Sequence, residues 1–60
     1  MYLLTMGNGT YRLTADEVIN LVGYAAKVAY TLTNPMTLVT VRVRNGRILT
    51  AAQAHQVGAY

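Results

Sequence analysis

The 60-residue sequence contains no cysteine, no serine, no tryptophan and no phenylalanine, and only two acidic residues. The absence of cysteine excludes disulfides, thiolate metal sites and a cysteine nucleophile. The absence of serine excludes the commonest hydroxyl nucleophile, and the single histidine, His55, has no partner that would make it a general base. The two acids, Asp16 and Glu17, are accounted for by a helix cap. We therefore expect a protein that is not an enzyme and has no cofactor or metal.

Targeting and membrane-spanning segments are also missing from the sequence. The first seven residues lack the basic start and the long apolar core of a signal peptide. The longest apolar-rich run, residues 18–32, is interrupted by Asn20, Gly23, Lys27 and Thr31, so it falls short of a membrane span. These absences, together with that of cysteine, favour a cytoplasmic protein with no membrane partner.

Hydrophobic residues, by contrast, are abundant: they make up 53% of the chain, and only 12% of its residues are charged. A chain this short has little interior, and without a disulfide or a metal it needs a partner or an unusually good core. We expect residues 1–60 to form a single domain, and the surplus of apolar surface predicts a homo-oligomer. The net charge of +3 is compatible with anionic partners.

An alternating segment followed by Asn45–Gly46 gives the clearest structural signal. Valines alternate with polar residues from position 39 to position 43. Asn-Gly is typical of a type I′ turn, because both central residues of that turn need a positive φ. The pattern predicts a hairpin over residues 37–52, with Val43 opposite Ile48. One face of this hairpin would then carry Arg42, Arg44, Arg47 and Leu49.

The first half of the chain predicts another hairpin and then a helix. Asn8–Gly9 suggests a hairpin over residues 2–13 with Met6 opposite Tyr11, in which the tyrosines at 2 and 11 pack in the core. Residues 14–17, Thr-Ala-Asp-Glu, match a capping box. Apolar residues then recur at helical spacing, which predicts a helix over residues 15–32 that Asn34–Pro35 ends.

Together these elements predict an α+β fold in the order ββαββ. Four strands would form a mostly antiparallel sheet with one helix packed on one face, and residues 53–60 would form a C-terminal tail. A single helix covers only one face of a sheet. The second face therefore meets solvent, a ligand or another subunit.

Four arginines on that second face are the candidate ligand-binding residues: Arg42, Arg44, Arg47 and Arg12. The planar guanidinium group suits phosphate oxygens, so these residues predict an anion-binding patch for nucleic acid or a nucleotide. Two other interpretations stay open. The arginines could belong to a solvated sheet face, or they could bind an acidic protein surface.

The candidate interface residues are leucines on that second face and tyrosines that border the polar stripe of the predicted helix: Leu3, Leu38, Leu49, Tyr24 and Tyr30. The leading hypothesis is a small homo-oligomeric binding protein that holds a phosphate-bearing ligand on its arginine face. The alternative is a protein-binding inhibitor or adaptor, for example a phage or mobile-element accessory protein that blocks a host factor. A larger protein target would then be the partner.

Overall fold

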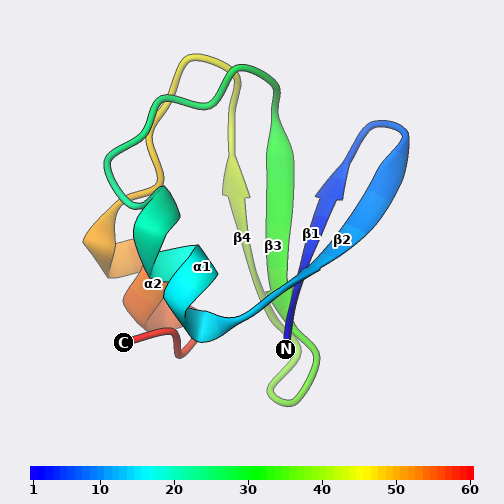
Figure 1. Cartoon of the computed structure of the whole chain (residues 1–60), viewed down its shortest axis with the longest axis vertical. Helices are drawn as coiled ribbons and strands as arrows, with labels where there is room; N and C mark the ends of the chain where they lie inside the picture. Colours follow the sequence, from blue (N-terminus) through cyan, green and yellow to red (C-terminus); the bar gives the residue numbers. More distant parts are fainter.

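The computed structural model describes all residues from 1 to 60 and contains four strands and two short helices (Figure 1). The elements are β1 (Tyr2–Met6), β2 (Gly9–Leu13), α1 (Ala15–Leu21), β3 (Tyr30–Asn34), β4 (Val39–Val43) and α2 (Ala51–Gln56). The strands form one antiparallel sheet in the order β2-β1-β3-β4. The α+β class and the four-stranded antiparallel sheet are confirmed. The single helix is wrong, because a second helix follows β4.

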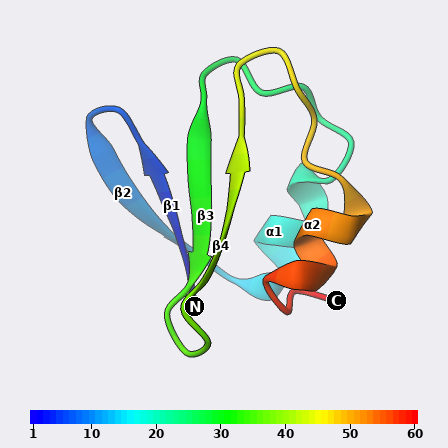
Figure 2. The ribbon, with the colours of Figure 1, turned by 180° about the vertical axis from the view of Figure 1, so that it is seen from behind.

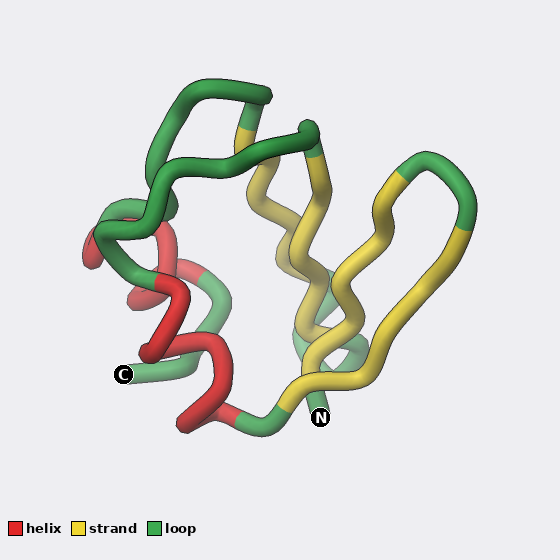
Figure 3. The backbone as a smooth tube through the Cα atoms, turned by 45° about the horizontal axis from the view of Figure 1, so that its top comes forward, coloured by secondary structure: helices red, strands yellow, loops and turns green.

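Both helices lie on the same side of the sheet, which is visible from two directions (Figures 2 and 3). The core forms between them and the sheet, with Val18 from α1, Leu32 from β3, Val43 from β4 and Ala54 from α2 all buried. We call the sheet face turned toward the helices the inner face and the opposite face the outer face. No helix of the chain has the length and apolarity needed to cross a membrane.

The first hairpin forms as predicted, but its register is shifted by two residues. Met6 pairs with Gly9 and Leu4 pairs with Tyr11, so Gly7 and Asn8 make the turn. The predicted pairing of Met6 with Tyr11 is therefore wrong. Because side chains alternate with a period of two, a two-residue shift leaves each side chain on its predicted face. Tyr11 is nevertheless 49% exposed, so its predicted place in the core is wrong.

The capping box at the start of α1 is confirmed. The Thr14 hydroxyl accepts from the Glu17 N–H at 3.2 Å, and the Glu17 carboxylate accepts from the Thr14 N–H at 2.9 Å. The helix, however, ends at Leu21 and not at residue 32, and Gly23 takes a left-handed φ of 88°. Residues 30–34 form β3 because their alternating apolar and polar side chains also fit a strand, and the position between β1 and β4 satisfies both of its edges.

Asn34 organises the turn that joins β3 to β4. Its side-chain oxygen accepts from the Met36 N–H at 2.9 Å, and its carbonyl accepts from the Leu38 N–H at 2.8 Å. Its side-chain nitrogen donates to the Val57 carbonyl at 2.8 Å, which joins the turn to the C-terminal residues. β4 therefore forms a hairpin with β3, the strand before it, and not with the residues after it. The predicted hairpin over residues 37–52 is wrong.

Asn45 and Gly46 do form a turn, closed by the Arg47 N–H, which donates to the Arg44 carbonyl at 2.9 Å. Only Gly46 has a positive φ, so the turn is not the predicted type I′ turn, and the chain after it leaves the sheet. Residues 46–49 run beside residues 23–26: Gly46 N–H donates to Ala26 O at 2.8 Å, and Ala26 N–H donates to Arg47 O at 2.7 Å. Figure 1 shows these two segments converging beyond the helices. This path buries Leu49 completely, whereas pairing with β4 would have placed it on the exposed face.

The C-terminal residues expected to form a tail are folded. A second capping box starts α2: the Thr50 hydroxyl accepts from the Gln53 N–H at 3.1 Å, and the Gln53 amide oxygen accepts from the Thr50 N–H at 3.2 Å. Val57 and Ala59 then enter the core. The Tyr2 hydroxyl donates to the Gly58 carbonyl at 2.8 Å, which ties the chain end to β1.

Candidate anion-binding site

The outer face of the sheet is a regular grid of side chains that are polar at every position except Leu3. Cross-strand pairing arranges eight residues in two rows of four, and five of the eight are threonines. The rows are Arg12–Leu3–Thr33–Thr40 and Thr10–Thr5–Thr31–Arg42. No aromatic side chain lies on this face. The grid can donate and accept hydrogen bonds, but it offers no platform on which a base could stack.

The four arginines do not form the single patch that the sequence predicts. Arg12 and Arg42 do lie on the outer face, but on opposite edge strands and in different rows. Three strand spacings and two residues along a strand separate their Cα atoms by roughly 16 Å. Arg44 and Arg47 lie beyond the end of β4, on either side of the Asn45–Gly46 turn.

A hollow of about 280 Å³ is lined by Arg42 and by two threonines of the same row, Thr5 and Thr31. The rest of its lining is Met6, Gly7, Ala29 and Tyr30. A guanidinium group beside two hydroxyls supplies a charged donor and two further hydrogen-bonding groups to one small volume. This set suits an oxyanion such as a phosphate group.

The pairing of the strands positions these three side chains. Thr31 lies on β3 directly between Thr5 on β1 and Arg42 on β4. Directly opposed residues in a sheet have Cβ atoms about 4.5–5.5 Å apart, so the three side chains emerge as neighbours. The Gln53 side chain also donates to the Arg42 carbonyl at 3.3 Å, which links the site to the cap of α2.

Charge is distributed unequally between the two ends of the molecule. Residues Arg42, Arg44, Arg47 and Lys27 lie at one end, which we call the basic end; the hydrogen bonds of Ala26 to Gly46 and Arg47 bring Lys27 there. Both acids lie at the start of α1, which follows the opposite end of the sheet. Four of the five basic side chains therefore lie at the end of the molecule that carries the hollow, and Arg12 lies at the other end.

The candidate interface residues fall into two groups. Leu38 and Tyr24 are exposed (81% and 71%), and Leu3 is half-buried within the outer face. Tyr30 and Leu49 are buried in the core, because each belongs to a segment that takes a path different from the predicted one. Burial also raises the pKa of the Tyr30 phenol, since the charged form would lose hydration.

Thr5 and Thr31 were not among the sequence candidates. Tyr30 and Leu32 alternate with two threonines, a pattern that fits the strand that holds Thr31, but the helical spacing of the preceding apolar residues extends the predicted helix over part of this segment. The hollow exists only because that strand lies between β1 and β4.

Comparison of the chain with protein-family models, with curated proteins and with solved structures finds no match. A functional assignment therefore depends on the geometry and charge of the molecule itself.

Proposed function

We propose that the protein is a small non-enzymatic binding protein that holds a phosphate-bearing ligand at its basic end. The observation that carries this proposal is the hollow in which Arg42 lies beside Thr5 and Thr31. A phosphate there would accept from the guanidinium and from the hydroxyls, and Arg44 and Arg47 would add longer-range attraction.

The spread of the cations favours a polymer over a single nucleotide. Arg42 and Arg44 are two residues apart at the end of β4, and Arg47 follows across a turn, so the basic end extends beyond one phosphate. A nucleic-acid backbone presents successive phosphates to such a row. The absence of aromatic side chains on the outer face supports contact with the backbone and not with stacked bases.

Homo-oligomerisation is a part of this proposal that rests on exposed apolar side chains. Met36 and Leu38, which are separated by Thr37 in the β3–β4 turn, are among the most exposed large hydrophobic residues of the chain. Large apolar side chains exposed close together in one turn are candidates for a protein contact. An assembled protein would also present several basic ends to one nucleic acid, which raises the overall affinity.

A second candidate function, a protein-binding inhibitor or adaptor, is favoured by one specific observation. Leu38 has a φ of 62° while its side chain is 81% exposed. A left-handed backbone disfavours leucine, and an exposed leucine contributes little to folding, so contact with another molecule is the reason we suggest for its presence. A phage or mobile-element accessory protein that blocks a host factor would be an example.

Fluorescence anisotropy with a short labelled single-stranded oligonucleotide tests the leading proposal. Arg42→Gln should lower the affinity about tenfold, because it removes a charge-assisted contact. The matched variant Arg12→Gln removes the same charge from the far edge strand and should change the affinity by about twofold or less. Affinity should fall steeply with salt, and Arg42→Gln should reduce the salt slope by about one.

Two outcomes would contradict the leading proposal: no binding at low salt, or equal losses in the two arginine variants. A competition with an unlabelled nucleotide separates a polymer ligand from a nucleotide ligand. If the second candidate is correct, native mass spectrometry of the protein from its source cells shows a hetero-complex. Leu38→Asp should then disrupt that complex and leave oligonucleotide affinity unchanged.

A further inference from the structure

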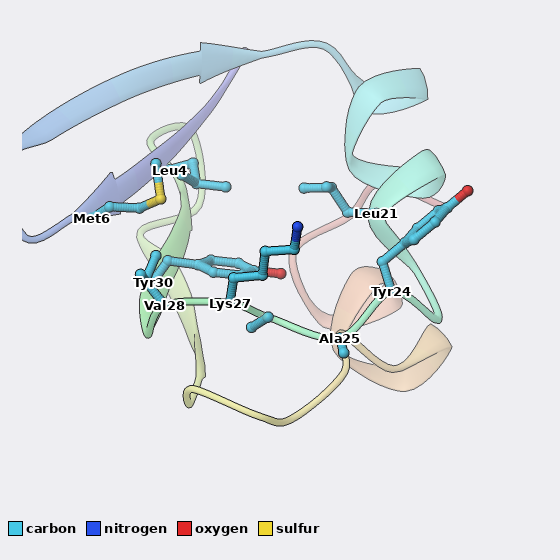
Figure 4. A pocket seen from close by; sticks show the side chains of 9 residues that line it. Leu4, Met6, Leu21, Tyr24, Ala25, Lys27, Val28 and Tyr30 are labelled. Carbon is cyan, nitrogen blue, oxygen red and sulfur yellow. The ribbon is translucent and has the colours of Figure 1, made fainter.

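A second concavity lies on the inner face and is almost entirely apolar (Figure 4). It has a volume of about 290 Å³, and eight of its nine lining residues are hydrophobic. Its most deeply buried lining residues are Leu4, Ala26 and Tyr30. The side chains of Met6, Leu21, Tyr24 and Val28 surround them. We call this concavity the groove.

The groove exists because the helices do not cover the whole inner face. α1 ends at Leu21, and residues 22–29 form an irregular segment. The predicted helix through residue 32, which would have covered more of the sheet, is therefore not present. The β1–β2 hairpin also diverges from the helices toward its tip (Figures 1 and 3). Leu4 and Met6 on β1 consequently face this space with no helix directly over them.

Lys27 is the one charged residue that lines the groove, and no acidic residue lines it. In Figure 4 its side chain extends over the opening and toward the space between Leu4 and Leu21. Tyr30 brings a phenol to the same space, and burial raises its pKa, so it remains a neutral hydrogen-bond donor over a wide pH range.

We propose that the groove binds a small amphiphilic anion, an aliphatic or aromatic carboxylate. Its apolar part would lie against Leu4, Ala26 and Tyr30, and its carboxylate would pair with Lys27. Charge complementarity decides the class of ligand: a lone cation at an apolar site favours an anion over a neutral or cationic amphiphile. The volume, at the lower limit of about 300 Å³ for ligand pockets, suits a short chain or a single ring.

This site is separate from the hollow around Arg42, although Met6 and Tyr30 contribute to the lining of both. The groove opens on the inner face, whereas Thr5, Thr31 and Arg42 belong to the outer face. Binding in the groove therefore does not depend on the proposed binding of a phosphate-bearing ligand. Each of the two proposals can fail without the other.

Titrations followed by amide NMR test the proposal with three probes that differ only in the head group: octanoate, octanol and octylamine. Octanoate should bind most tightly and shift the amides of Leu4, Met6 and Val28. Lys27→Met should lower octanoate affinity about threefold to fivefold, the range for a partly exposed ion pair, and leave octanol affinity unchanged. Arg47→Gln is the matched control, because it removes a nearby cation that does not line the groove.

The proposal is overturned if the three probes bind equally, if none binds, or if the two variants weaken octanoate binding to the same degree. It is also overturned if the groove amides shift when the protein is diluted without any probe, which indicates self-association through the groove, and if octanoate does not compete with that self-association. A second copy of the chain would then be the occupant. Lys27 is exposed, so Lys27→Met should fold normally. A native amide spectrum of this variant then shows that a loss of octanoate affinity does not come from unfolding.

Discussion

Leu32 and Thr33 are neighbours on β3, yet they belong to two different environments. Leu32 points to the inner face and is completely buried. Thr33 points to the outer face, where its hydroxyl shares a 2.9 Å hydrogen bond with the hydroxyl of Thr40. The inner face supplies the burial that stabilises this small domain, while the outer face contributes little to it. The outer face is therefore free to carry a polar site at little cost in stability.

The largest expected effect comes from removing the inner-face member of this pair. Leu32→Ala should lower the free energy of unfolding by about 2–5 kcal/mol, because it leaves a cavity in the centre of the core. Thr33→Ala should lower it by about 1 kcal/mol or less. Urea denaturation measures both values, and equal losses would show that the two faces do not differ as described.

A comparison of two threonine hydroxyls should give a smaller effect. Thr50→Ala removes the cap of α2 and should cost about 1 kcal/mol in unfolding free energy. Thr10→Ala removes an outer-face hydroxyl that lies 3.4 Å from the Thr5 hydroxyl and should cost less than about 0.5 kcal/mol. Thermal unfolding of both variants checks this order. The reverse order would mean that the outer-face grid stabilises the sheet more than the helix cap does.

The exposed turn between β3 and β4 should respond in the opposite direction. Leu38→Gly keeps the left-handed φ but removes the Cβ that makes this φ unfavourable. It should therefore raise the free energy of unfolding by about 0.5–1 kcal/mol. Urea denaturation of this variant beside Leu38→Ala, which keeps the Cβ, isolates the backbone effect. A loss of stability in Leu38→Gly would show that the leucine side chain is part of the folded core.

The smallest expected effect is a pH dependence on the inner face. The folded-state pKa of Tyr30 is raised by burial, so the folded protein holds the phenolic proton more tightly than the unfolded chain. This stabilisation is complete below the ordinary tyrosine pKa of about 10 and is lost as the pH rises through the folded-state value. Unfolding free energy measured across this range should fall less steeply in Tyr30→Phe than in the parent. Parallel curves would contradict the prediction.

Local signals in the sequence predicted local structure well. The Thr14 cap, the first hairpin and the face of each of its side chains follow from short patterns, and the two-residue register shift leaves those faces unchanged. The same signal also occurs at Thr50–Gln53, where Thr-Ala-Ala-Gln matches a capping box and a helix forms in place of the end of the predicted second hairpin and the start of the predicted tail.

The pairing of distant segments could not be predicted in this way. Asn45–Gly46 is a strong turn signal, but a turn does not determine which segment the following residues contact. The burial of Leu49 and hydrogen bonds to residues 23–26 decide that choice, and both depend on the complete fold. The sequence therefore indicates Arg42 as a candidate residue, whereas Thr31 becomes a candidate only when the position of β3 is known.

The most direct test of the central claim is an amide NMR titration of the protein with a short single-stranded oligonucleotide at low salt. The account predicts shifts concentrated at Thr5, Gly7, Thr31 and Arg42, with the amides of α1 unchanged, and loss of these shifts in Arg42→Gln. Shifts confined to the inner face or to α1, or no shifts at all, would contradict it.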